Sequence, residues 1–134
     1  MRIQFFEHMI PPTVTHQEKK FTARHGKLVA YEPPELKDAR AKLMAYIGKH
    51  KPEKPLDGPV LLDVLWLFPI TGNHQDGEAK ITKPDTDNLQ KLLKDVMTDL
   101  GFWKDDAQVY DERVIKRYAD LPGIAIYVCG EGHL

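Results

Sequence analysis

The clearest pattern in the chain is an apolar stripe that predicts a helix from about Asp87 to Leu100. Its apolar residues recur at intervals of three and four, which places them on one side of a helix with 3.6 residues per turn. They are Leu89, Leu92, Leu93, Val96, Met97 and Leu100. Gly101 follows directly and is typical of the position at which a helix ends. We therefore expect an amphipathic helix that packs its stripe against a core.

A second helix and a hairpin are predicted upstream. Helical spacing of apolar residues begins after Pro33-Pro34 and continues to Ile47, and proline is well tolerated in a first helical turn. Residues 19–24 and 27–31 flank a glycine that suits a tight turn, so they predict a β-hairpin. Residues 71–80 contain two glycines and an asparagine and are expected to form a flexible loop.

The remaining apolar stretches predict four strands and with them the fold class. The predicted strands are 3–6, 60–68, 108–118 and 124–128. The run 60–68 is apolar almost throughout, which is typical of a strand buried in the centre of a sheet. Strands that alternate with two helices predict a two-layer α+β or α/β fold, with a mixed sheet and two main helices in a single domain.

Composition narrows the class of protein without identifying it. The 134 residues are 42% apolar and 29% charged, which is ordinary for one globular domain. No apolar run approaches the length of about 20 residues that spans a bilayer, and the N-terminus reaches a charge before a signal-peptide core could form. The single cysteine, Cys129, excludes an intramolecular disulfide. We therefore expect a cytoplasmic protein that does not associate with membranes.

Charge is unevenly distributed although the net charge is only −1. Residues 16–51 hold nine Lys and Arg against four Asp and Glu, a balance of +5, whereas residues 101–112 carry −3. Several of the cations lie on or beside the predicted hairpin, namely Lys19, Lys20, Arg24 and Lys27. The hairpin could be an ordinary solvated element, or its cations could contact a nucleic-acid backbone.

Carboxylates flank the predicted helix on both sides. Asp85 and Asp87 stand at its start, and residues two apart in an extended segment can point to the same side. Asp106 follows the helix, so about 20 Å of helix must be retraced before it could meet Asp85. Asp85 or Asp87 alone could simply cap the helix and complement its dipole. Spacing alone does not decide whether the three carboxylates meet.

Convergence of these carboxylates would require a cation. Two carboxylates about 4 Å apart repel by about 4 kcal/mol at an effective dielectric of 20, and ligands that are all oxygen favour Mg²⁺ first and Mn²⁺ next. Lys91 lies one helical turn after Asp87. It could contact a phosphate or form a plain helix ion pair with Asp87.

The two acidic segments resemble those of the RusA family of Holliday junction resolvases. The similarity lies in the run Lys83-Pro84-Asp85-Thr86-Asp87-Asn88-Leu89-Gln90-Lys91 and, after the helix, in Phe102-Trp103-Lys104-Asp105-Asp106-Ala107-Gln108-Val109. The stretch from Ile10 to Lys20 is also similar to the N-terminal part of some members. The resemblance implies one RusA-like nuclease domain over residues 1–134.

The same resemblance implies an activity, a partner and a set of site residues. It implies a homodimer that binds four-way DNA junctions and nicks two strands symmetrically with Mg²⁺, in DNA recombination and repair. Asp85, Asp87 and Asp106 would be the catalytic metal ligands, and Lys91 would be catalytic or would position the phosphate. Family members often carry several arginines directly before the first aspartate, whereas this chain has only Lys80 and Lys83 there. These two lysines join the hairpin cations as predicted DNA contacts.

Two alternatives stay open at the level of sequence. A junction-binding or DNA-binding protein could keep the acidic cluster for folding and no longer cleave. A phosphotransfer or nucleotide-dependent enzyme could use Asp85-Thr86-Asp87 to hold a metal–nucleotide complex, although the chain has no Gly-rich phosphate loop. Loss of cleavage with retained binding in an Asp85→Asn variant would distinguish a nuclease from both.

Overall fold

The helices and strands follow the predicted order along the chain. The computed structural model describes residues 1–15, 20–24 and 26–130. The strands are β1 (Arg2–His8), β2 (Lys20–Arg24), β3 (Lys27–Tyr31), β4 (Val60–Pro69), β5 (Val109–Ala119) and β6 (Gly123–Gly130). The helices are α1 (Pro34–Ile47) and α2 (Thr86–Leu100), with short 3-10 helices η1 (Gly48–His50) and η2 (Asp106–Gln108).

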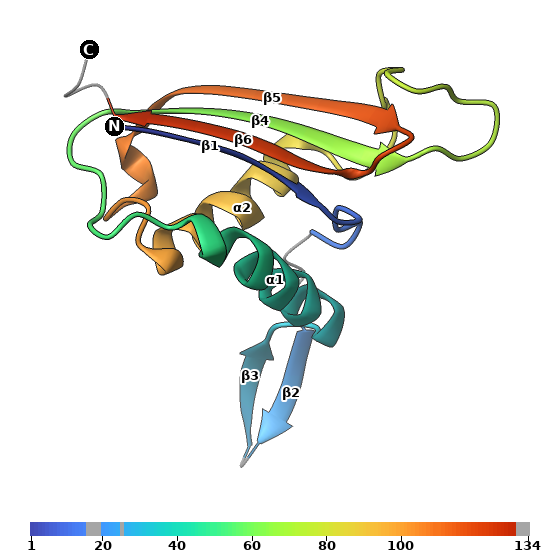
Figure 1. The fold of residues 1–134 in the computed structure, drawn as a ribbon. Helices are drawn as coiled ribbons and strands as arrows, with labels where there is room; N and C mark the ends of the chain where they lie inside the picture. The colour runs from blue at the N-terminus through green and yellow to red at the C-terminus, as the bar shows by residue number, and fades with distance from the viewer. Residues whose placement is uncertain (16–19, 25, 131–134) are drawn as a thin grey trace.

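Four strands form one mixed sheet in the order β1-β6-β4-β5. β4 and β5 run parallel, as the α2 crossover between them requires, and the other two pairings are antiparallel. Both main helices cover the same face of the sheet (Figure 1). The predicted two-layer α+β fold with a mixed sheet is confirmed. No helix in the described part of the chain is long and apolar enough to cross a membrane.

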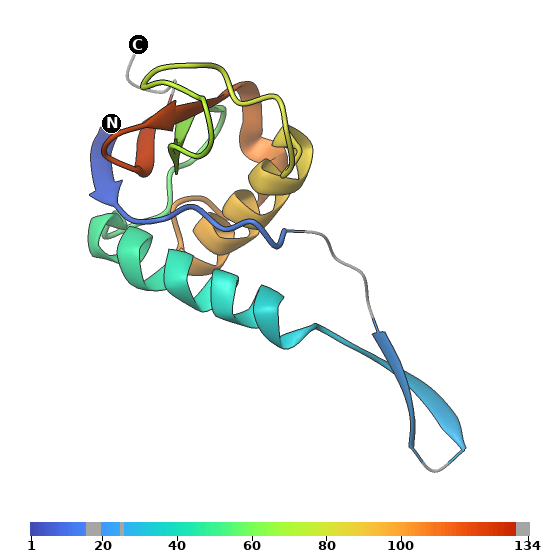
Figure 2. The same cartoon turned by 90° about the vertical axis from the view of Figure 1, so that its right-hand side faces the viewer.

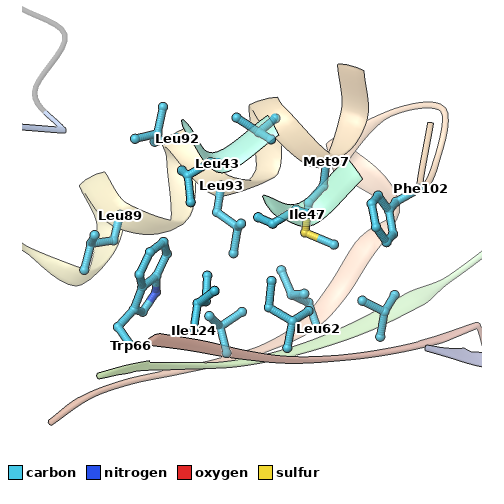
Figure 3. Close-up of a cluster of buried hydrophobic side chains, with 14 of the residues drawn as sticks. Leu43, Ile47, Leu62, Trp66, Leu89, Leu92, Leu93, Met97, Phe102 and Ile124 are labelled. Atoms are coloured by element: carbon cyan, nitrogen blue, oxygen red, sulfur yellow. The ribbon is translucent and has the colours of Figure 1, made fainter. Parts of the chain in front are cut away.

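The core lies between the sheet and the two helices. β4 alternates strictly between buried and half-buried residues, because successive strand residues point to opposite faces. Its buried side chains include Leu62 and Trp66, which face the α2 leucines and the α1 residue Ile47 (Figure 3). Trp66 and Trp103 are both buried and pack within the core.

Helix α2 is held by the stripe that its sequence predicts. Five of the six stripe residues are buried, and Leu100 packs at the margin of the core. Burial of a leucine side chain contributes about 2 kcal/mol, so this stripe fixes which face of α2 remains accessible. Gly101 ends the helix with a φ of 86°, in the left-handed region that favours glycine. The accessible face of α2 carries Asp87 and Lys91.

The predicted hairpin forms a separate two-stranded sheet. β2 and β3 pair antiparallel from Lys20 opposite Tyr31 to Arg24 opposite Lys27. The ribbon extends away from the four-stranded sheet, beyond the start of α1 (Figures 1 and 2). Three of the predicted DNA contacts, Lys20, Arg24 and Lys27, therefore lie on this arm. Lys19 lies outside the described residues.

Candidate active site

Asp85 occupies the position directly before α2 but does not act as its cap. Its backbone is extended and its carbonyl accepts a hydrogen bond from the amide of Leu89, whereas its side chain makes no capping hydrogen bond. The carboxylate is exposed. Asp87 lies in the first turn, where a negative charge complements the helix dipole. Capping therefore does not explain Asp85, although the dipole partly explains Asp87.

Three of the predicted site residues line one groove between α2 and β5. Asp87, Lys91 and Asp106 line this hollow of about 560 Å³. Its other lining residues are Thr86, Gln90, Lys94, Glu112 and Val114. Asp87 lies on the first turn of α2 and Asp106 on η2, after the helix. We call this hollow the α2–β5 groove.

A chain of hydrogen bonds forms the wall of the α2–β5 groove. The buried Gln90 accepts a hydrogen bond from Trp66 Nε1 at 2.9 Å and donates its own amide nitrogen to Glu112 at 2.7 Å. Lys94 donates to the other oxygen of Glu112 at 3.0 Å. Both polar ends of the buried amide are thus satisfied, as burial requires. Neither Gln90 nor Glu112 is predicted from the sequence as a wall residue of the site.

Asp105 and Asp106 belong to a 3-10 turn and not to a strand. A strand would have turned the two carboxylates to opposite faces, whereas both line a second hollow, of about 350 Å³, beside the C-terminal half of α2. Asp105 accepts a hydrogen bond from the amide of Ala107 at 2.9 Å, and Gln108 completes a capping box around it. The side chain of Asp105 is therefore engaged in the capping box. Asp106 is the one of the two that lines both this hollow and the α2–β5 groove.

The three predicted metal ligands do not meet within one protomer. Asp85 lines a different hollow, of about 480 Å³, with Thr13, Val14, Thr15, Lys83, Pro84 and Asn88. Asp87 lines the α2–β5 groove from the first turn of α2, whereas Asp106 lines it from η2, which follows the other end of that helix. No three His, Cys, Asp or Glu side chains gather to hold a metal ion in residues 1–15, 20–24 and 26–130. The donor chemistry suits Mg²⁺, but the placement in a single chain does not.

Lys116 contributes to the site by contacting the segment before Asp85, a role that the sequence does not predict. It pairs with Trp66 across β4 and β5, so it points to the helix side of the sheet. Its Nζ donates to the carbonyls of Thr82 and Pro84, both at 2.7 Å. Burial lowers the pKa of Lys116, and repulsion from Lys80 adds to this effect. Alternation along β5 was the available signal, because residues 112, 114 and 116 share one face.

The loop before Asp85 is tied to β5 over part of its length. The amide of Gly77 donates to Tyr118 at 2.8 Å, and the amide of Tyr118 donates to Glu78 at 2.9 Å. Lys80 N donates to the carbonyl of Lys116 at 3.0 Å. The composition of residues 71–80 predicts a flexible loop. The turns are present, but the second half of the loop is hydrogen-bonded to β5. β5 is an edge strand, so its outer backbone N–H and C=O groups are available to pair with the loop.

The two lysines of this loop differ in their surroundings. Lys80 is half-buried, its Nζ donates to Thr82 Oγ1 at 2.6 Å, and it lies 5.2 Å from the ring centres of Phe68 and Tyr118. Lys83 is exposed and lines the same hollow as Asp85. Of the two predicted DNA contacts, Lys83 is therefore the more accessible.

Comparison with known proteins points to one family. A family model described as "Endodeoxyribonuclease RusA" matches residues 10–129, which include both acidic segments. The "Uncharacterized protein YqaN" of Bacillus subtilis is 30% identical over 116 residues, 78% of this chain and 81% of that protein. The crossover junction endodeoxyribonuclease rusA of Lactococcus phage r1t is 30% identical over 111 residues, 81% of this chain and 83% of its own. Its counterpart in Escherichia coli K12 is 62% identical over 56 residues, 42% of this chain and 47% of its own.

Proposed function

This chain belongs to the RusA family of endodeoxyribonucleases, and from that premise we propose that it resolves four-way DNA junctions. In this proposal it is a single nuclease domain over residues 1–134. It acts on branched DNA in the cytoplasm, with Mg²⁺ or, as a substitute, Mn²⁺, and makes paired symmetric nicks during recombination and repair. The proposal rests chiefly on one observation, the shared groove of Asp87, Lys91 and Asp106.

The groove has the charges that hydrolysis of a phosphodiester needs. The carboxylates of Asp85, Asp87 and Asp106 would hold the divalent cation. A bound divalent cation stabilises negative charge on a phosphoryl group. The ammonium groups of Lys91 and Lys94 line the same groove and would attract the DNA backbone there. Lys91 is exposed and does not contribute to the core, because α2 packs against the sheet through the opposite face of the helix.

A homodimer would bring the separated carboxylates together. A twofold axis across the middle of the α2–β5 groove exchanges its two ends, so that Asp87 of one protomer approaches Asp106 of the second. Each composite site would then contain carboxylates from both protomers, and the dimer would contain two such sites. Two equivalent sites also match a junction with twofold symmetry. The hairpin cations Lys20, Arg24 and Lys27, with Lys83, would contact the DNA backbone and supply affinity that falls with salt.

Cleavage of an end-labelled four-way junction tests the function. We expect paired nicks in Mg²⁺, none in EDTA, and none in a linear duplex of the same sequence. Asp87→Asn should abolish nicking and retain junction binding, because the neutral isostere removes a ligand but reduces repulsion toward phosphate. Asp38→Asn, which alters an exposed carboxylate on α1, is the matched control and should cleave normally. Tight junction binding without cleavage in either Mg²⁺ or Mn²⁺ would instead favour a protein that binds junctions only.

A further inference from the structure

Asp85 is preceded by a short segment whose course is set by one residue of the neighbouring strand. Residues 80–84 connect the loop on the β5 edge to α2. Three hydrogen bonds join this segment to Lys116 of β5. Its backbone carbonyl accepts from Lys80 N at 3.0 Å, and its Nζ donates to Thr82 and Pro84 at 2.7 Å each. One residue therefore fixes both ends of the segment.

The surroundings of the Lys116 ammonium make it depend on the carbonyls of Thr82 and Pro84. Lys116 is half-buried, so its charge has lost part of its hydration and depends on the two carbonyls for compensation. Lys80 repels it, whereas Asp85 and Tyr118 attract it. The titratable groups that act on the ammonium are thus Lys80, Asp85 and Tyr118. Displacement of the segment would remove both carbonyl acceptors together.

We propose that Lys116 is a positioning residue that fixes Asp85 for the chemistry by holding the carbonyls of Thr82 and Pro84. This inference rests on the proposed nuclease function, in which Asp85 is a metal ligand. Lys116 acts through the backbone before Asp85 and does not touch the reacting phosphate. A carboxylate that moves by about 1 Å can lower the rate about 100-fold, so the hold of Lys116 should affect the chemical step more than DNA binding.

Two substitutions at Lys116 separate positioning from general stability. Lys116→Met removes the donors and keeps an unbranched apolar stem, whereas Lys116→Arg keeps both charge and donors. Lys49→Met is the control, because Lys49 pairs with Glu7 of β1, the strand at the opposite edge of the sheet from β5, and its side chain is 59% exposed. If Lys116→Met does not yield folded protein, Lys116→Gln is used in its place, because the glutamine side chain is uncharged and shorter than that of lysine.

The first measurement is amide hydrogen exchange of the full chain without DNA or metal. In Lys116→Met we expect peptides over residues 80–89 to exchange about tenfold faster, as for local opening after loss of charged hydrogen bonds. Peptides from β4 and β6 should stay within about twofold of the wild type. Lys116→Arg should restore protection at 80–89, and Lys49→Met should leave it unchanged. Unchanged exchange at 80–89 in Lys116→Met, or equal loosening of the whole sheet, would overturn the proposal.

The second measurement is single-turnover cleavage at saturating junction over a series of Mg²⁺ concentrations. Lys116→Met should need more Mg²⁺ for half-maximal rate and lose about 100-fold in rate, with junction affinity within about threefold of the wild type. A rate equal to that of the wild type would overturn the positioning role. If the wild type itself does not cleave, the proposed function fails, and the exchange data still decide whether Lys116 holds the segment.

Discussion

The indole of Trp66 donates its Nε1 hydrogen to the side-chain oxygen of Gln90 at 2.9 Å in the interior, where β4 meets α2. Because Gln90 also donates to Glu112, this single amide connects the central strand, the helix and the edge strand β5. The rotational setting of α2 is therefore fixed by a polar contact as well as by leucine packing. That setting determines which α2 side chains line the α2–β5 groove.

Removal of the Gln90 amide should destabilise the protein. Gln90→Ala leaves the buried Trp66 N–H without an acceptor and opens a small void, so we expect the free energy of unfolding to fall by about 2–4 kcal/mol. Urea unfolding followed by tryptophan fluorescence measures the loss. Trp66→Phe combined with Gln90→Leu removes both polar partners together and should cost less than the sum of the single changes. If the double variant loses as much free energy of unfolding as Trp66→Phe and Gln90→Leu lose in sum, the inferred coupling is contradicted.

The ion pairs of Glu7 should make stability depend on pH in the acid range. Hydrogen bonds from His50 and Lys49 lower the pKa of Glu7 below its ordinary value of 4.5. In this range the unfolded chain binds more protons than the folded chain, so stability falls as the pH falls through the lowered pKa. Glu7→Gln should cost about 1 kcal/mol at neutral pH, and the difference from the wild type should vanish in strong acid. Denaturant unfolding at several pH values tests this, and a difference independent of pH would contradict it.

Gly123 should not tolerate a side chain. A Cβ at this position would lie 2.4 Å from the carbonyl oxygen of Glu7 and 2.4 Å from Cζ of Phe6. Gly123→Ala must therefore push β1 away from β6, which should cost about 2–3 kcal/mol. Gly130→Ala on the same strand is the control, because its Cβ would meet only Leu56 Cδ2 at 3.6 Å. Thermal unfolding should separate the two variants, and equal melting temperatures would contradict the steric argument.

Mixed dimers test whether each site draws on two protomers. Asp87→Asn and Asp106→Asn should each be inactive as homodimers. If the sites are composite, a dimer of one Asp87→Asn and one Asp106→Asn protomer has one site with both changes and one intact site. Co-expression with two different affinity tags would isolate this dimer, and we expect it to nick one strand of a junction. An inactive mixed dimer, with an active wild type, would show that each site lies within a protomer.

The sequence predicted the elements more fully than the site. The leucine stripe and Gly101 located the end of α2, and the apolar run 60–68 located the central strand, because burial imposes a period on both. Asp106 could not be placed in this way. Asp106 lies in a 3-10 turn that depends on the capping box of Asp105 and Gln108. A capping box is formed by individual side-chain hydrogen bonds, so it leaves no periodic pattern of apolar residues in the sequence.

Lys116 shows a second limit of sequence reasoning. Alternation in β5 does predict that Lys116 faces the helices, but a lysine at such a position has no partner visible in the sequence. Its partners are backbone carbonyls of a loop more than 30 residues earlier in the chain. Such contacts depend on the path of the loop along β5, which local propensities do not determine.

The placement of β6 has a consequence for how the chain is made. β6 is the last of the described strands, yet it lies between β1 and β4 in the sheet, and the amide of Gly130 donates to the carbonyl of Met1. During synthesis, β4, α2 and β5 can assemble as a parallel unit while β1 has no neighbour to pair with. In the sheet that the structure describes, β1 pairs with β6 alone, so β1 can join the sheet only after β6 has been synthesised.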